Sequence, residues 1–233
     1  DADRHGRYPA IVKRAAEKPF RANGNTFDLA VADYDGDGDM DCFLAEITHW
    51  WAGSSSSDLS MLLVNGGSKE GFSFVRRPGL TPRPRSVERW NQGDMHAGWL
   101  DVDNDGRLDL LVASSDYPDL QTLRLYRQRG PTAFDDWSDR LGVSWRNAGQ
   151  ISFADYDRDG ATDIVVTTNN RRLTKEQRAG RDLSVGLLRN REAARSGHGF
   201  FSLRLEGRGH GHSNRDAIGA RVTLWVAGQR QTR

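Results

Sequence analysis

The nine residues DYDGDGDMD, at positions 33–41, decide the fold expected for this chain. The same pattern returns as DVDNDGRLD at 101–109 and as DYDRDGATD at 155–163. Each copy has aspartate at its positions 1, 3, 5 and 9 and glycine at its position 6. Alternate carboxylates that converge on one point, with a glycine that lets the backbone turn sharply, form an oxygen cage for a hard cation.

The donor set of these loops predicts calcium, with about three ions in the chain, because all-oxygen ligation suits calcium better than zinc or copper. Magnesium is the weaker alternative, since it prefers a smaller octahedral shell. A set of acidic turns without metal is the other alternative. The expected ligands are four aspartate side chains and one backbone carbonyl in each loop. They are Asp33, Asp35, Asp37, Asp41 and the carbonyl of Asp39; Asp101, Asp103, Asp105, Asp109 and the carbonyl of Arg107; and Asp155, Asp157, Asp159, Asp163 and the carbonyl of Ala161.

The sequence around each loop predicts β-strands rather than the helices of an EF-hand. An alternating run such as TFDLAVADYD enters the first loop and a short apolar run, MDCFLAEI, leaves it. An EF-hand also needs a bidentate glutamate at position 12, where this chain has Leu44, Val112 and Val166. We therefore expect each loop to join two neighbouring strands of one sheet.

Further strand-like runs after each loop predict repeated units of about four strands. They are SMLLVN and FSFVRR in the first unit, LRLYRQ and a weaker segment around AFDDWSDRLG in the second, and SVGLLRN, after the charged insertion NNRRLTKEQRAGRD, in the third. Repeats of this kind are typical of β-propeller blades. The expected fold class is all-β, with four-stranded antiparallel blades that carry calcium loops, followed by a partial β-rich C-terminal domain.

Charge and composition limit the partners. The chain has 233 residues and a net charge of +1, and thirteen of its 32 acidic residues lie in the three loops. The rest is rich in arginine, which favours an anionic ligand, although a solvated surface is the simpler interpretation because the bases are spread out. We expect no nucleic-acid partner and no membrane span. Cys42 is the only cysteine, and its apolar neighbours predict a buried, unreactive thiol.

The strands that enter the loops present one apolar face and one face of small residues. Trp99 and Phe153 are examples of the first, and Gly98 of the second; we attribute the small residues to crowding at a propeller axis. Polar residues stand five positions before each loop: Asp28, His96 and Gln150. They should lie at the end of the strands remote from the loops, where a ligand could bind, and ordinary strand-end polarity is the simpler explanation.

Two other polar groups have competing interpretations. The cluster His49, Trp50 and Trp51 could stack on a sugar ring, and packing between blades is the alternative that we favour. The pair His210 and His212 has the spacing of metal ligands, and a solvated loop is favoured. No nucleophile is placed to complete a catalytic set with His96, so an enzyme is the less favoured function.

The three units resemble FG-GAP repeats, also called VCBS repeats, which are marked by a strand, a D-x-D-x-D-G-x-x-D calcium loop and a second strand. The stretch SNRDAIGARV at 213–222 resembles the start of the ASPIC/UnbV domain, as found in the cartilage acidic protein family and its bacterial relatives. The resemblance implies a secreted, cell-surface or periplasmic calcium-stabilised propeller, commonly of seven blades. Its domains would be an N-terminal segment of unclear role (1–24), a propeller portion of about three blades (25–196) and the start of the C-terminal domain (197–233).

The function that the resemblance favours is binding or scaffolding of an unknown protein or glycan. The alternatives are an enzyme or biosynthetic accessory protein that uses a site near Asp28, His96 and Gln150, and a purely structural spacer. Because three blades do not close a ring, we expect the chain to be a fragment, with open blade edges through which it associates.

Overall fold

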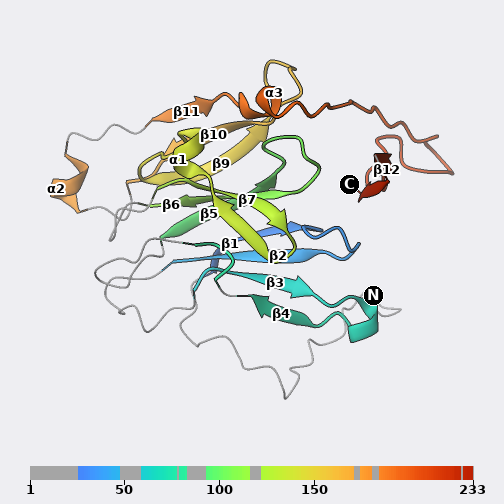
Figure 1. Cartoon of the computed structure of the whole chain (residues 1–233), viewed down its shortest axis with the longest axis horizontal. Helices are drawn as coiled ribbons and strands as arrows, with labels where there is room; N and C mark the ends of the chain where they lie inside the picture. Colours follow the sequence, from blue (N-terminus) through green and yellow to red (C-terminus); the bar gives the residue numbers. More distant parts are fainter. Residues whose placement is uncertain are drawn as a thin grey trace.

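The computed structural model describes residues 26–47, 59–77, 79–82, 93–115, 122–170, 174–179, 184–226 and 228–232. The described part is all-β with only short helices, and its main sheets are antiparallel, so the expected fold class is confirmed. Figure 1 shows three sheets stacked in chain order, from blue-teal through green to yellow-orange. The segments 1–24 and His49–Trp51 lie outside the described residues.

The first sheet, called blade A here, consists of the four strands expected for the first unit. Its strands pair in the order β1-β2-β3-β4. Their bounds are β1 Thr26–Ala32, β2 Asp41–Glu46, β3 Met61–Asn65 and β4 Phe74–Arg77, with the 3-10 turn η2 at Ser68–Glu70. Loop A (residues 33–41) joins β1 to β2, as predicted.

The second sheet, blade B, repeats this order with loop B (101–109) between its first two strands. The bounds are β5 Asp94–Leu100, β6 Asp109–Ser114, β7 Arg124–Gly130 and β8 Ala133–Asp136. The weaker segment predicted here is strand only at its start, because helix α1 (Ser138–Leu141) follows at once. The Asp136 carboxylate accepts the Ser138 N–H at 3.0 Å and stabilises that change of direction.

The third sheet, blade C, has three strands, with loop C (155–163) between the first two. Its elements are β9 Ala148–Ala154, β10 Asp163–Thr168 and β11 Val185–Leu188, with α2 Lys175–Arg178 in the charged insertion and α3 Glu192–Ser196 after β11. The described tail ends in the small ribbon β12 Thr223–Val226 and β13 Gln229–Thr232. Figure 1 shows β12 apart from the three stacked sheets.

Apolar side chains between successive blades form the core. One cluster joins blade A to blade B through Phe43, Tyr126 and Trp99, and another joins blade B to blade C through Leu111 and Ile151. The first strands of the blades also contact one another, β1 with β5 and β5 with β9. The stacking is therefore face to face, as in propeller blades.

One of the small residues on the first strands, Gly98, is explained by its neighbour in the next blade. A Cβ atom at Gly98 would lie 2.4 Å from the ring of Phe153 in the next blade. Gly98 is small because an aromatic side chain of the neighbouring blade covers it, so crowding at the axis does not explain this position.

The outer face of blade A remains apolar and open among the described residues. Phe27, Leu29 and Val31 are 55%, 49% and 51% exposed. Cys42 pairs with Val31 across the strands and is half-buried, which is less burial than predicted. Burial nevertheless raises the pKa of the Cys42 thiol, which keeps the thiolate rare. No helix in the described part of the chain is long and apolar enough to cross a membrane.

Candidate metal centres

The first aspartate of each loop holds the glycine that turns the backbone. Gly38, Gly106 and Gly160 have φ values of 102°, 86° and 85°, which side-chain-bearing residues rarely adopt. Their N–H groups donate to the carboxylates of Asp33, Asp101 and Asp155 at 3.1, 2.8 and 3.0 Å. The repeated position 6 glycine is thus required by the turn itself.

The last aspartate of each loop is fully buried and ties the loop to the third strand. Asp109, which is 0% exposed, accepts the N–H of Val102 at 2.9 Å and the N–H of Gln128 at 2.8 Å. Asp41 and Asp163 make the same pair of bonds in the other blades. Their donors are Tyr34 and Asn65 in blade A, and Tyr156 and Asn190 in blade C.

Sequence reasoning missed the polar residue that recurs at the end of the third strand or just after it. Asn65, Gln128 and Asn190 supply the second backbone donor in each blade. Their recurrence at the end of the runs SMLLVN, LRLYRQ and SVGLLRN is the signal that could have revealed them.

Burial makes the charged form of Asp41 and Asp109 unfavourable. It raises the pKa of Asp41 to about 7 and that of Asp109 to about 7, although the backbone donors oppose the shift. Neighbouring aspartates raise both pKa values further, which is the electrostatic situation that a bound cation relieves.

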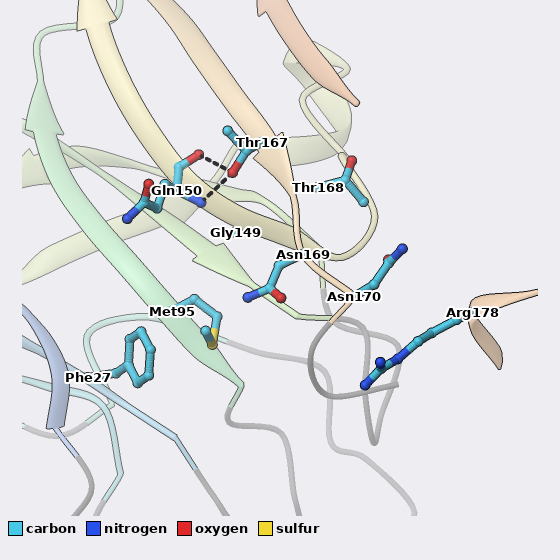
Figure 2. A pocket seen from close by; sticks show the side chains of 9 residues that line it. All are labelled: Phe27, Met95, Gly149, Gln150, Thr167, Thr168, Asn169, Asn170 and Arg178. Carbon is cyan, nitrogen blue, oxygen red and sulfur yellow. Dashed lines mark hydrogen bonds between the residues drawn. The ribbon is translucent and has the colours of Figure 1, made fainter. Parts of the chain in front are cut away.

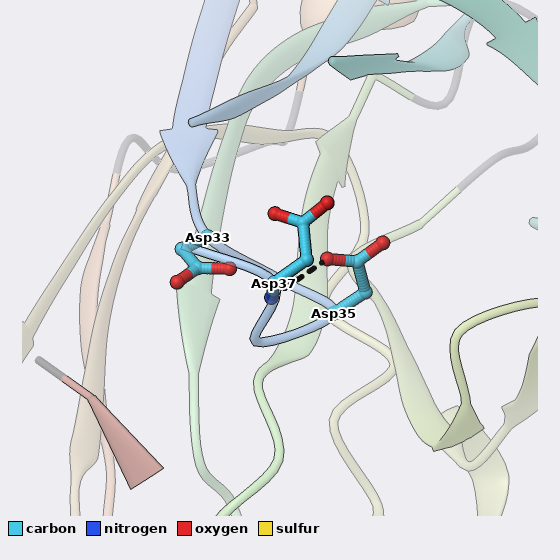
Figure 3. A group of neighbouring side chains, drawn as sticks. All are labelled: Asp33, Asp35 and Asp37. Atoms are coloured by element: carbon cyan, nitrogen blue, oxygen red, sulfur yellow. Dashed lines mark hydrogen bonds between the residues drawn. The ribbon is translucent and has the colours of Figure 1, made fainter. Parts of the chain in front are cut away.

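Three carboxylates of each loop converge. One oxygen from each lies within 4.8 Å of the others in the groups Asp33–Asp35–Asp37, Asp101–Asp103–Asp109 and Asp155–Asp157–Asp163. Figure 3 shows the group of loop A, in which all three side chains project from one turn. The groups do not include the expected ligands Asp41, Asp105 and Asp159.

One carboxylate oxygen in loop A is available to bind a cation. Oδ1 of Asp33 is buried and has no hydrogen-bond partner in the described structure. At position 7 the structure shows the N–H groups of Asp39, Arg107 and Ala161 donating to the position 5 carboxylates at 2.8, 2.9 and 3.0 Å. Ligation by their carbonyl oxygens stays a prediction.

The polar residues at the opposite strand ends connect the blades. Asp28 of blade A accepts the N–H of Ala97 at 2.9 Å and lies 3.4 Å from Nε2 of His96. His96 of blade B accepts the N–H of Ile151 in blade C at 3.1 Å. Asp28 and His96 are therefore engaged between blades.

Gln150 instead lines a pocket of about 500 Å³ at this end of the blades. Figure 2 shows its side chain beside those of Thr167 and Asn169, with Phe27 and Met95 across the opening. The remaining lining residues are Gly149, Thr168, Asn170 and Arg178. The pocket combines amide and hydroxyl groups with one aromatic ring.

The tail crosses the loop end of the sheets. Nδ1 of His198 lies 2.9 Å from the carbonyl oxygen of Asp103, and the ring of Phe200 covers Gly160. In the stretch 213–222, the side chain of Asn214 accepts the N–H of Ile218 at 2.7 Å in a turn, and a Cβ atom at Gly219 would meet nothing within 4 Å. His210 and His212 are exposed, as a solvated loop requires.

Residues 101–166, from loop B into β10, match the family model described as an FG-GAP-like repeat. None of the curated proteins compared with the chain matches it. The match confirms the resemblance to an FG-GAP repeat over these residues, and repeats of this kind are typical of binding and adhesion modules with propeller-like folds. The resemblance of the tail to the ASPIC/UnbV domain stays a prediction.

Proposed function

We propose that the chain is a calcium-stabilised β-propeller portion that serves as a secreted or cell-surface binding module. The observation that carries the calcium assignment is the buried Oδ1 of Asp33, which has no hydrogen-bond partner in the described structure and belongs to one of the three converging carboxylates of loop A. The fifteen positions predicted from the sequence are the proposed ligands. Calcium would supply positive charge that offsets the repulsion among the aspartates of each loop.

Further assignments belong to this proposal. The FG-GAP-like repeat supports the secreted location and the propeller portion at 25–196, and SNRDAIGARV supports an ASPIC/UnbV start at 197–233. The open apolar face of blade A supports association through that face. The contacts of Asp28 and His96 between blades favour a binding role over catalysis at that end.

Removal of calcium tests the proposal. A chelator should lower the melting temperature, and excess calcium should restore it, because one site filled at ten times its Kd adds about 1.4 kcal/mol. Magnesium at the same concentration should restore less of the melting temperature than calcium does. Thermal melts of the wild type and of Asp35→Asn give the comparison. An unchanged melting temperature of the wild type in chelator would sink the calcium assignment.

The pocket at the remote end is the proposed ligand site. Amide and hydroxyl groups beside an aromatic ring suit a polyhydroxylated ligand such as a glycan. In a buffer that contains calcium, the double variant Gln150→Ala, Asn169→Ala should no longer bind to an immobilised oligosaccharide array. The matched control is Thr162→Ala, in the remote loop C, which should retain binding. If the double variant and the Thr162→Ala control bound equally well, the pocket would be excluded as the ligand site. If the wild type did not bind the array, a glycan ligand would be excluded.

A further inference from the structure

One position on the third strand distinguishes blade A from blades B and C. The residues that immediately precede Asn65, Gln128 and Asn190 are Val64, Arg127 and Arg189. Because those three polar residues make the same bond to the last aspartate of their loops, the preceding positions are structurally equivalent. Two blades therefore have arginine where the third has valine.

Arg127 binds the carboxylates of loop B. Its Nε lies 2.7 Å from Oδ2 of Asp103, and its Nη2 lies 2.5 Å from Oδ2 of Asp105. Arg107 pairs with the same Asp105. The Arg127 side chain is only 15% exposed, so water screens these ion pairs weakly.

Arg189 does the same in loop C. Its Nη2 lies 2.7 Å from Oδ2 of Asp157 and 3.1 Å from Oδ2 of Asp159. This side chain is 47% exposed, so its effect should be smaller than that of Arg127.

Blade A has valine, not arginine, at this position of its third strand. Val64 packs against the cluster between blades A and B. No ion pair joins Asp33, Asp35, Asp37 or Asp39 to a described lysine or arginine, and the guanidinium of Arg221 lies beside Gly38 without pairing to them. Loop A also has five aspartates, whereas loops B and C have four each.

The partners of the position 5 carboxylate differ between loop A and the other two loops. Asp37 belongs to the converging group of loop A, as Figure 3 shows. Asp105 and Asp159 lie outside the groups of loops B and C and bind the arginines instead. A guanidinium that forks between two carboxylates neutralises part of their charge without any metal.

We propose that Arg127 and Arg189 act as internal counter-ions that reduce the dependence of loops B and C on calcium. Loop A, which lacks one, is the site at which the divalent cation chiefly determines stability. This inference rests on the proposed function, since it assumes that the loops bind calcium. A cation entering loop B or C must compete with a guanidinium for the position 5 carboxylate.

The experiment compares arginine variants with a matched control on the same strand. Arg127→Met and Arg189→Met remove the counter-ions, and Arg129→Met removes an exposed surface arginine of β7 that pairs with Asp135. Melting temperatures are measured in chelator and in saturating calcium, and calorimetric titration with calcium chloride counts the sites. Arg127→Lys keeps the charge and should give an intermediate result.

Removal of the counter-ions should increase the calcium dependence. The double variant should melt below the Arg129→Met control in chelator, and its calcium-induced rise should be about twice that of the wild type. Arg127→Met alone should have a larger effect than Arg189→Met. Asp35→Asn should abolish most of the calcium-induced rise in the wild type but only part of it in the double variant.

Different results would overturn the proposed function and the counter-ion inference. If calcium gives no heat and no rise in melting temperature with any variant, the proposed function is wrong. If the wild type binds calcium but the double variant has the same rise as Arg129→Met, or binds calcium more weakly than the wild type, the counter-ion inference alone is overturned.

Discussion

Replacing Asp109 with alanine should lower the free energy of unfolding by roughly 2–6 kcal/mol, because two buried donors each lose a partner worth about 1–3 kcal/mol. Those donors are the N–H groups of Val102 and Gln128, at 2.9 and 2.8 Å from the carboxylate. The loss would detach loop B from the end of β7. The carboxylate is 0% exposed, so water does not replace it.

Urea denaturation in chelator measures this cost without a contribution from calcium. The control is Asp135→Ala in the same blade, where a 39% exposed carboxylate pairs with Arg129. The control should change the unfolding free energy by at most about 1 kcal/mol. If the two variants were equally stable, the structural role of the last aspartate would be rejected.

Gly98→Val should lower the unfolding free energy by about 1–3 kcal/mol through overpacking between blades B and C. The new Cβ would lie 2.4 Å from the Phe153 ring, closer than real Cβ contacts. The ring must move, and the apolar contacts of Phe153 with the core between these blades would weaken. Denaturant unfolding of the purified variant provides the measurement.

Two further variants separate overpacking from the loss of a strand glycine. Gly130→Val places a side chain where a Cβ meets nothing within 4 Å, and it should be nearly neutral. In a Phe153→Leu background, Gly98→Val should cost less, with a coupling free energy of at least about 0.5 kcal/mol. Additive costs would show that Gly98 and Phe153 do not interact.

The sequence predicted the hairpins well because their signals are local. Alternation before Asp33 and the apolar run after Asp41 located β1 and β2 within a residue or two, and the same held for the other loops. The segment after Phe134 was predicted less well. Its change from β8 to α1 depends on Asp136 bonding to Ser138, which hydrophobic alternation does not encode.

The candidate site was predicted in part. The spacing of aspartates identified the converging groups, because nine residues contain both the carboxylates and the turn that brings them together. The spacing did not separate Asp37, which joins its group, from Asp105, which binds arginine. That difference depends on Arg127, which lies 22 residues further along the chain.

The sequence by itself determined the repeated loops, the strands around them and the convergence of their carboxylates, since all of these depend on residues close together in the chain. Only the tertiary structure decided which partners complete the loops. The register of the third strand places Arg127 against loop B, whereas Val64, at the equivalent position, packs against the cluster between blades A and B. Packing of blade on blade likewise decided that Gly98 lies under Phe153, because contacts between distant segments arise only when the sheets stack.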